Sequence, residues 1–161
     1  TCESSVPGVY AVGDVNGGPQ FTYISLDDFR IVFGALTGNS QYTLKDRKNI
    51  PYTTFLIPPL ARVGLTEEDA INKGYTVKTK EMLVATMPRA HVNDYLKGAF
   101  KIVVDAETNL ILGATLYSQG AEELINLIKM AMDNNIPYTY FKNQIFTHPT
   151  MAENLNDLCN F

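Results

Sequence analysis

Residues 100–117 read FKIVVDAETNLILGATLY and predict a β-hairpin. The runs 100–104 and 110–117 are rich in β-branched and other apolar residues, and a polar turn joins them. From Ala121, apolar residues recur at helical spacing until residues 134–137, which read NNIP, end the pattern. This region therefore predicts two paired strands followed by an amphipathic helix.

Three more segments extend this pattern towards the N-terminus. Residues 60–64 and 75–85 have the composition of strands, and residues 53–57 form another extended run. Thr66 and Asp69 have the spacing of a capping box at the start of a short helix. Strands interleaved with helices indicate an α+β fold, in which helices pack on an antiparallel β-sheet.

The first forty residues show a different pattern. Residues 9–12 form a short apolar run bounded by glycines, and they predict one buried strand. A helix is expected from about Thr22 to Gly38. Ser25 with Asp28 resembles its capping box, although Thr22 could equally start the helix.

Residues 39–52 are polar and show no periodic apolar face. They predict a boundary between two domains. We therefore expect an N-terminal strand and helix in residues 1–40, a linker in residues 41–52, and a second domain in residues 53–161.

Composition excludes several classes of partner. With 13 basic and 17 acidic residues the net charge is −4, so no basic surface is expected for a nucleic acid or an anionic membrane. No apolar run approaches the ~18 residues of a membrane-spanning helix, and no export signal is visible. Cys2 and Cys159 stand at opposite ends without CxxC spacing, which predicts neither a disulfide scaffold nor a metal site, and favours a cytoplasmic protein.

The dipeptide Gly13-Asp14 is the first candidate for a binding site. It follows the apolar run and precedes a glycine-containing loop and a helix. An Asp at the end of a strand can accept hydrogen bonds from vicinal hydroxyls, while a helix N-terminus offers N–H groups and partial positive charge. A sugar alcohol next to an electron-rich ring would fit this arrangement. The alternative is that Gly13-Asp14 simply turns the chain.

His148 and Glu153 are the second candidate. An imidazole can transfer protons near neutral pH, and a carboxylate partner would orient the ring and fix its tautomer. Pro149 suits the first position of a final short helix, which would leave His148 just outside it. The alternative is an exposed capping histidine beside a solvated glutamate. His91 is expected at the surface, and Cys159 is expected to fill the core as a small apolar residue.

Taken together, several motifs resemble class I pyridine nucleotide-disulfide oxidoreductases, the family of glutathione reductase, dihydrolipoamide dehydrogenase and mercuric reductase. The resemblance covers nearly the whole chain. Within the family, the sequence is similar to a bacterial branch near mercuric reductase, some members of which reduce hypothiocyanous acid. The motifs, in family order, are VPGVYAVGDV at 6–15, PPLARVGLTE at 58–67, KIVVD at 101–105, ILGA at 111–114, AEELI at 121–125, and HPT at 148–150 with Glu153.

The resemblance implies a role for each candidate residue. Gly13 and Asp14 would close an FAD site, with Asp14 bonded to the ribityl chain, and Phe21 with Thr22 would place helix N–H groups beside the flavin pyrimidine. The domain after the linker would form a homodimer. His148, paired with Glu153, would then supply an acid–base imidazole to the dithiol of the partner subunit, and a cis peptide bond would precede Pro149.

Three motifs of the resembled family are absent from this sequence: the FAD-binding GxGxxG, the redox pair CxxxxC and the second dinucleotide site. We therefore expect the C-terminal part of an FAD- and NAD(P)H-dependent enzyme that reduces a small disulfide or oxidant. By itself this part would be inactive and would bind no cofactor. Its first 45 residues would be disordered, rearranged or paired with a second copy. The alternatives are a stand-alone homodimerisation module or, with less support, a small hydrolase.

Overall fold

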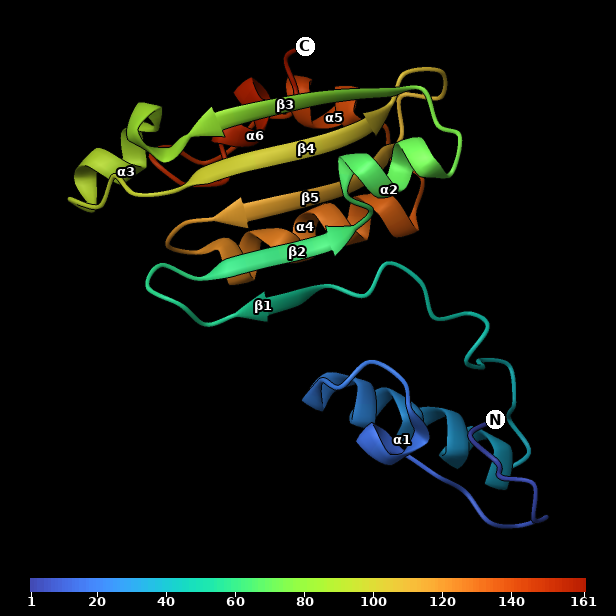
Figure 1. The fold of residues 1–161 in the computed structure, drawn as a ribbon. Helices are drawn as coiled ribbons and strands as arrows, with labels where there is room; N and C mark the ends of the chain where they lie inside the picture. Colours follow the sequence, from blue (N-terminus) through green and yellow to red (C-terminus); the bar gives the residue numbers. More distant parts are fainter. The chain divides into compact units, whose positions relative to one another are not determined.

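The hairpin predicted at residues 100–117 lies within a five-stranded sheet in the computed structural model, which describes residues 1–161 (Figure 1). All four pairings in the sheet are antiparallel, and the strand order is β1-β2-β5-β4-β3. The strands are β1 (Tyr52–Thr54), β2 (Leu60–Gly64), β3 (Val77–Leu83), β4 (Ala99–Asp105) and β5 (Ile111–Tyr117).

Helix α4 lies behind β2 and β5 in Figure 1 and covers one face of this sheet, whereas α2 lies on the other face, where its Glu67 pairs with Lys101 of β4. The helices of this part are α2 (Glu67–Asn72), α3 (Pro88–Val92), α4 (Ala121–Asp133), α5 (Tyr138–Asn143) and α6 (Asn154–Leu158), with a 3₁₀ turn, η2, at Val84–Thr86. The predicted α+β fold, an antiparallel sheet with packed helices, is confirmed.

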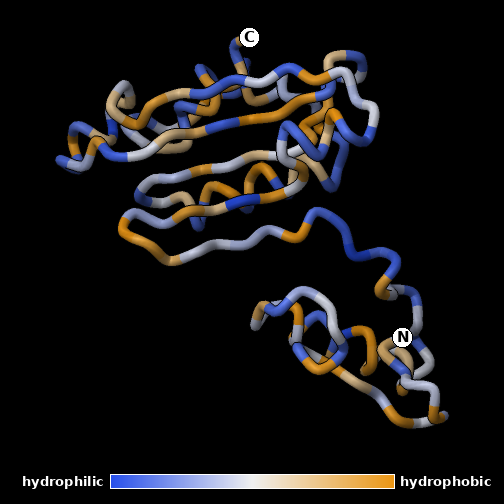
Figure 2. The backbone as a smooth tube through the Cα atoms, in the orientation of Figure 1, coloured by the Kyte–Doolittle hydropathy of each residue, from blue (hydrophilic) through white to orange (hydrophobic).

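The register explains which side chains form the core. Phe100 lies opposite Leu116, and Ile102 lies opposite Ala114, and all four are buried. Their neighbours along each strand face the other way. Figure 2 shows β4 as mostly hydrophobic with one hydrophilic stretch. Helix α4 covers the core-forming face, because its apolar stripe, which includes Ile128, packs into this core.

The chain divides into two compact units, residues 1–48 and residues 49–161. The first unit contains a 3₁₀ turn, η1 (Gly13–Asn16), and the helix α1 (Thr22–Leu36). The helix begins at the expected residue, and Gly38 follows its end with φ of +77°, a conformation that glycine adopts without strain.

The strand expected at residues 9–12 is not present. Val9 and Val12 are 52% and 43% exposed, and the nearest pairing is a single bridge between Glu3 and Tyr10. A strand needs a neighbouring strand for its backbone hydrogen bonds, and residues 1–48 form no sheet. Outside η1 and α1, residues 1–48 are turns and irregular backbone.

No helix has the length and apolar composition that crossing a membrane requires.

Candidate functional site

His148 and Glu153 form a hydrogen-bonded pair in the loop between α5 and α6. The distance between His148 Nδ1 and Glu153 Oε2 is 2.7 Å. The His148 side chain is 70% exposed and that of Glu153 is 18% exposed, so the carboxylate is fixed against the protein while the ring faces outward. The second oxygen of Glu153, Oε1, is buried without a hydrogen-bond partner in this chain.

Thr150 holds the turn that carries this pair. Its hydroxyl donates to the carbonyl of Thr147 at 2.8 Å and accepts from the backbone N–H of Glu153 at 3.2 Å. The turn delays the start of α6 until Asn154, so the prediction that Pro149 occupies the first helical position is wrong. The peptide bond before Pro149 is cis, as the resemblance implied.

The geometry of the pair suits proton transfer. A carboxylate at Nδ1 favours the tautomer that carries its proton there, which leaves a lone pair on Nε2 of His148 towards the outside. The second unit offers the ring no accessible thiol, because its cysteine, Cys159, is buried in the core and burial raises its pKa to about 12. A thiol that exchanges a proton with His148 would therefore have to come from outside this unit.

The four residues proposed for flavin binding lie in the first unit, on η1 and at the start of α1. Gly13 is buried with φ of +72°, and a side-chain Cβ there would come within 2.8 Å of Ser25 Oγ. Asp14 is exposed in η1. Phe21 is the N-cap residue of α1, and no side chain caps this end, where Thr22 is the first helical residue.

Asp28 connects these two segments, and its role differs from the expected capping box with Ser25. Its fully buried carboxylate accepts from the Gly13 N–H and from Asn16 Nδ2, each at 2.8 Å, and from Arg47 Nη2 at 2.5 Å. The capping prediction is wrong because Asp28 is the seventh residue of a helix that starts at Thr22, and its side chain faces η1.

Arg47 was missed by the sequence analysis. Its guanidinium also pairs with Asp27, with 2.7 Å between Nε and Oδ2, so it joins two adjacent carboxylates of α1 to the end of the polar segment. Two adjacent acids near the middle of an amphipathic helix were the available signal, because such a pair is buried only with a cationic partner.

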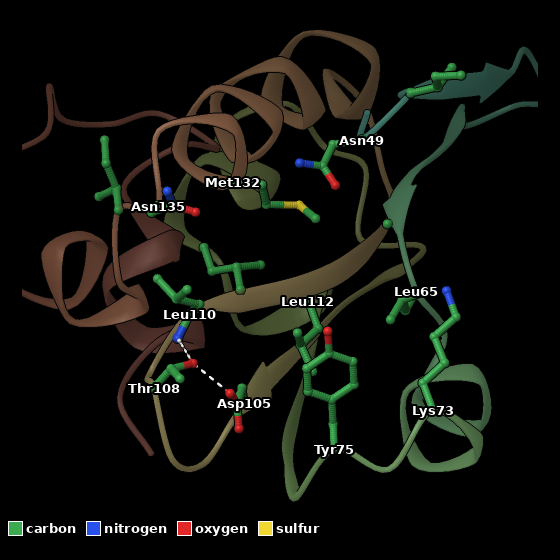
Figure 3. Close-up of a pocket in the computed structure, with 14 residues that line it drawn as sticks. Asn49, Leu65, Lys73, Tyr75, Asp105, Thr108, Leu110, Leu112, Met132 and Asn135 are labelled. Atoms are coloured by element: carbon green, nitrogen blue, oxygen red, sulfur yellow. Dashed lines mark hydrogen bonds between the residues drawn. The ribbon is translucent and has the colours of Figure 1, made fainter. Parts of the chain in front are cut away.

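A cavity of the second unit lies elsewhere. It has a volume of about 640 Å³ near the turn between β4 and β5, and Lys73, Tyr75 and Asn135 contribute polar groups to its lining (Figure 3). Thr108 donates to Asp105 in this turn at 2.5 Å. Neither member of the proposed acid–base pair lines this cavity.

Comparison with known proteins places this geometry in a family. Residues 50–159 match the dimerisation domain of the pyridine nucleotide-disulphide oxidoreductases. The chain belongs to this family. The resemblance inferred from the sequence motifs is therefore confirmed, and the second unit is a dimerisation domain of this oxidoreductase family.

Relatives within this oxidoreductase family match both units. The probable pyridine nucleotide-disulfide oxidoreductase RclA of Escherichia coli is 48% identical over 155 residues, 96% of this chain and 35% of that protein. A mercuric reductase of Lysinibacillus sphaericus is 37% identical, over 95% of this chain and 28% of that protein. The chain thus spans about a third of the length of these relatives.

A solved structure of E. coli RclA, described as an HOCl-induced flavoprotein disulfide reductase, superimposes with a TM-score of 0.94 and 47% identity. The match covers 98% of this chain and 36% of that one. LpdA from Mycobacterium tuberculosis, at 22% identity and a TM-score of 0.85, shares the fold.

Proposed function

We propose that this chain dimerises within a flavin-dependent disulfide oxidoreductase and supplies His148 and Glu153 as the acid–base pair of the partner subunit's active site. The exposed, carboxylate-oriented imidazole on a dimerisation domain carries this proposal. A ring fixed at Nδ1 and open at Nε2 can accept a proton from a thiol and return it to a leaving group.

The proposal assigns a part to each segment of the chain. Residues 1–40 are the C-terminal segment of an FAD-binding domain, residues 41–52 are a linker, and residues 53–161 form the dimerisation domain and make a homodimer. The family match over residues 50–159 supports the last assignment.

Gly13, Asp14, Phe21 and Thr22 would help to hold FAD. They fit this group because Asp14 presents an exposed carboxylate to hydroxyls, and because no side chain caps the N-terminal end of α1 that begins at Thr22. FAD supplies the redox chemistry when bound, with NAD(P)H as the electron source. The residues of this chain hold and orient the flavin and transfer no electrons themselves.

By itself the chain would turn over no substrate and would bind no cofactor. It has two cysteines, Cys2 and Cys159, which are far apart in the sequence and are not paired. A dithiol spaced for disulfide exchange would have to come from the rest of the enzyme.

The substrate class we propose for the complete enzyme is a small disulfide or reactive oxidant. The names of the relatives support this range, since they include a disulfide reductase induced by HOCl and mercuric reductases. We expect neither a nucleic acid nor a membrane as a partner, because a chain with a net charge of −4 provides no positive electrostatic field to attract phosphate groups. We place the enzyme in the cytoplasm.

The decisive experiment is His148→Ala in the complete enzyme, assayed with cystine and with hypothiocyanous acid. We expect turnover to fall by ~10²- to 10⁴-fold, the usual contribution of a general acid–base group. His91→Ala is the matched control, because His91 is also exposed but lies on α3, with its ring hydrogen-bonded to the Ala85 carbonyl and not to a carboxylate. Turnover within a few-fold of wild type in His148→Ala would refute the acid–base role.

A further inference from the structure

Asn156 joins the end of α5 to α6 through its side-chain amide. Its Nδ2 lies 2.6 Å from the carbonyl oxygen of Phe141, 3.0 Å from that of Gln144 and 3.3 Å from that of Lys142. One side chain therefore serves three backbone acceptors that are 12 to 15 residues away in the sequence.

Phe141 and Lys142 lie in the last turn of α5, where a helix leaves its last carbonyl groups without partners inside the helix, and Gln144 is the C-cap residue that follows. The backbone cap of α5 does not satisfy all three carbonyls, since the Gln144 N–H donates only to the carbonyl of Phe141. The chemistry also fixes the orientation of the amide. If Oδ1 of Asn156 took the place of Nδ2, it would face three carbonyl oxygens and would have no proton to share.

The loop that carries His148 starts at this point. Ile145 is 95% exposed, so it provides no packing, and Phe146 is the one side chain near the start of the loop that packs against the core. At the other end, Asn154 Nδ2 donates to the carbonyls of Thr150 and Met151 at 3.2 and 3.1 Å. The loop is thus held at both ends by amides of α6.

Helix α6 is itself tied to the sheet. Lys80 on β3 donates to the carbonyls of Asp157 and Asn160 at 2.7 and 2.5 Å, at the C-terminal end of the helix, where a cation is favourable. Leu155 and Leu158 are completely buried. Asn156 therefore binds the start of the loop to a helix that is itself anchored to the sheet.

We propose that Asn156 is a positioning residue of the acid–base site: it fixes the point at which the loop leaves α5 and thereby the direction of His148. The inference rests on the proposed function of His148. Asn156 touches no reacting atom and acts through the loop. A displacement of about 1 Å in such a group can reduce a rate by ~10²-fold.

The first test measures the loop in this chain without catalysis. Asn156→Asp keeps the size of the side chain but places carboxylate oxygens against the three carbonyls. We expect the backbone order parameters of residues 145–148, measured by ¹⁵N relaxation, to fall from about 0.85 to below about 0.6. The matched control is Asn160→Asp, which makes the same change at the exposed end of the same region and should leave them unchanged. Unchanged values in Asn156→Asp would overturn the inference, and Asn156→Ala answers the same question if that variant does not fold.

The second test is a double-mutant cycle in the complete enzyme. It measures turnover with hypothiocyanous acid and, independently of any acceptor, the pH at which iodoacetamide alkylates the reduced redox thiols half-maximally. We expect Asn156→Asp to slow turnover by ~10- to 10²-fold and to shift the alkylation midpoint in the same direction as His148→Ala. Combined with His148→Ala, it should have no further effect, because it acts through that ring.

The two proposals fail differently in this cycle. If His148→Ala is active and its alkylation profile is unchanged, the proposed function is wrong. If His148→Ala is impaired but Asn156→Asp has no effect, or has an effect that adds fully to it, the positioning role is wrong.

Discussion

Arg47 pairs with the buried carboxylate of Asp28, with 2.5 Å between Nη2 and Oδ1. Both side chains are at most 10% exposed, and Asp28 also accepts the Gly13 N–H of the turn that carries Asp14. The pair therefore fixes the turn η1 against α1. Both segments are parts of the proposed flavin site.

Arg47→Met should destabilise the first unit by about 3–5 kcal/mol, because it leaves a buried charge without its partner. The measurement is hydrogen exchange of the α1 amides in this chain. Lys45→Met, an exposed change in the same segment, is the control and should have little effect. Equal protection of α1 in Arg47→Met and wild type would show that the ion pair does not stabilise this unit.

The first unit should also lose stability in acid. Burial alone raises the pKa of Asp28, but hydrogen bonds from Arg47 and from the Gly13 N–H outweigh it, so the pKa lies below its ordinary value of 3.8. A carboxyl with a lowered folded pKa contributes stability that is present above 3.8 and is lost as the pH falls through the folded value. The chemical shift of the Gly13 amide should report this titration, with a midpoint below 3.8. A midpoint at or above that value would contradict the network.

The two cysteines should react differently with iodoacetamide at pH 8. Cys159 is fully buried, and burial raises its pKa to about 12. At pH 8 its thiol is therefore protonated, and the reagent cannot reach the sulfur. Burial, and then the charge of Asp28, also raise the pKa of Cys2, but its side chain is partly exposed. Mass spectrometry should find Cys2 alkylated in the native chain and Cys159 alkylated only after unfolding. Modification of Cys159 at the rate of Cys2 would mean that the core around α6 opens readily.

Lys80→Met should loosen α6. The change removes two charge-assisted hydrogen bonds to the helix C-terminus, and we expect a cost of about 1–3 kcal/mol. Lys78→Met is a matched control, because Lys78 precedes it by two residues on the same face of β3 and is exposed. Urea denaturation of the second unit would measure the difference, and equal midpoints for the two variants would exclude the anchoring role.

The parts of the fold that the sequence predicted depend on local patterns. The hairpin of β4 and β5, the apolar stripe of α4 and the capping box at Thr66 all involve residues close together in the chain. The expected strand at residues 9–12 failed because a strand also depends on a neighbour, which a local apolar run cannot reveal.

The candidate site shows the same contrast between local patterns, which the sequence reveals, and contacts between distant residues, which it does not. His148 and Glu153 are five residues apart, so their spacing was visible in the sequence. Asp28 and Arg47 are 19 residues apart, and Asn156 reaches carbonyls 12 to 15 residues away. The function of such residues comes from backbone groups or charges that only the folded chain brings to them. The adjacent acids of α1 could indicate that a cation is needed, but not that it is Arg47, and Asn156 gave no signal.

Subunit complementation tests most directly whether His148 serves the partner's active site. Complete enzyme carrying His148→Ala is mixed with enzyme in which a redox cysteine is replaced by serine, and the subunits are exchanged by mild denaturation and refolding. Each mixed dimer would contain one site with intact cysteines facing an intact His148, so we predict recovery of roughly a quarter of wild-type activity from two inactive parents. A mixture that stays as inactive as its parents, although mass spectrometry shows mixed dimers, would contradict the account.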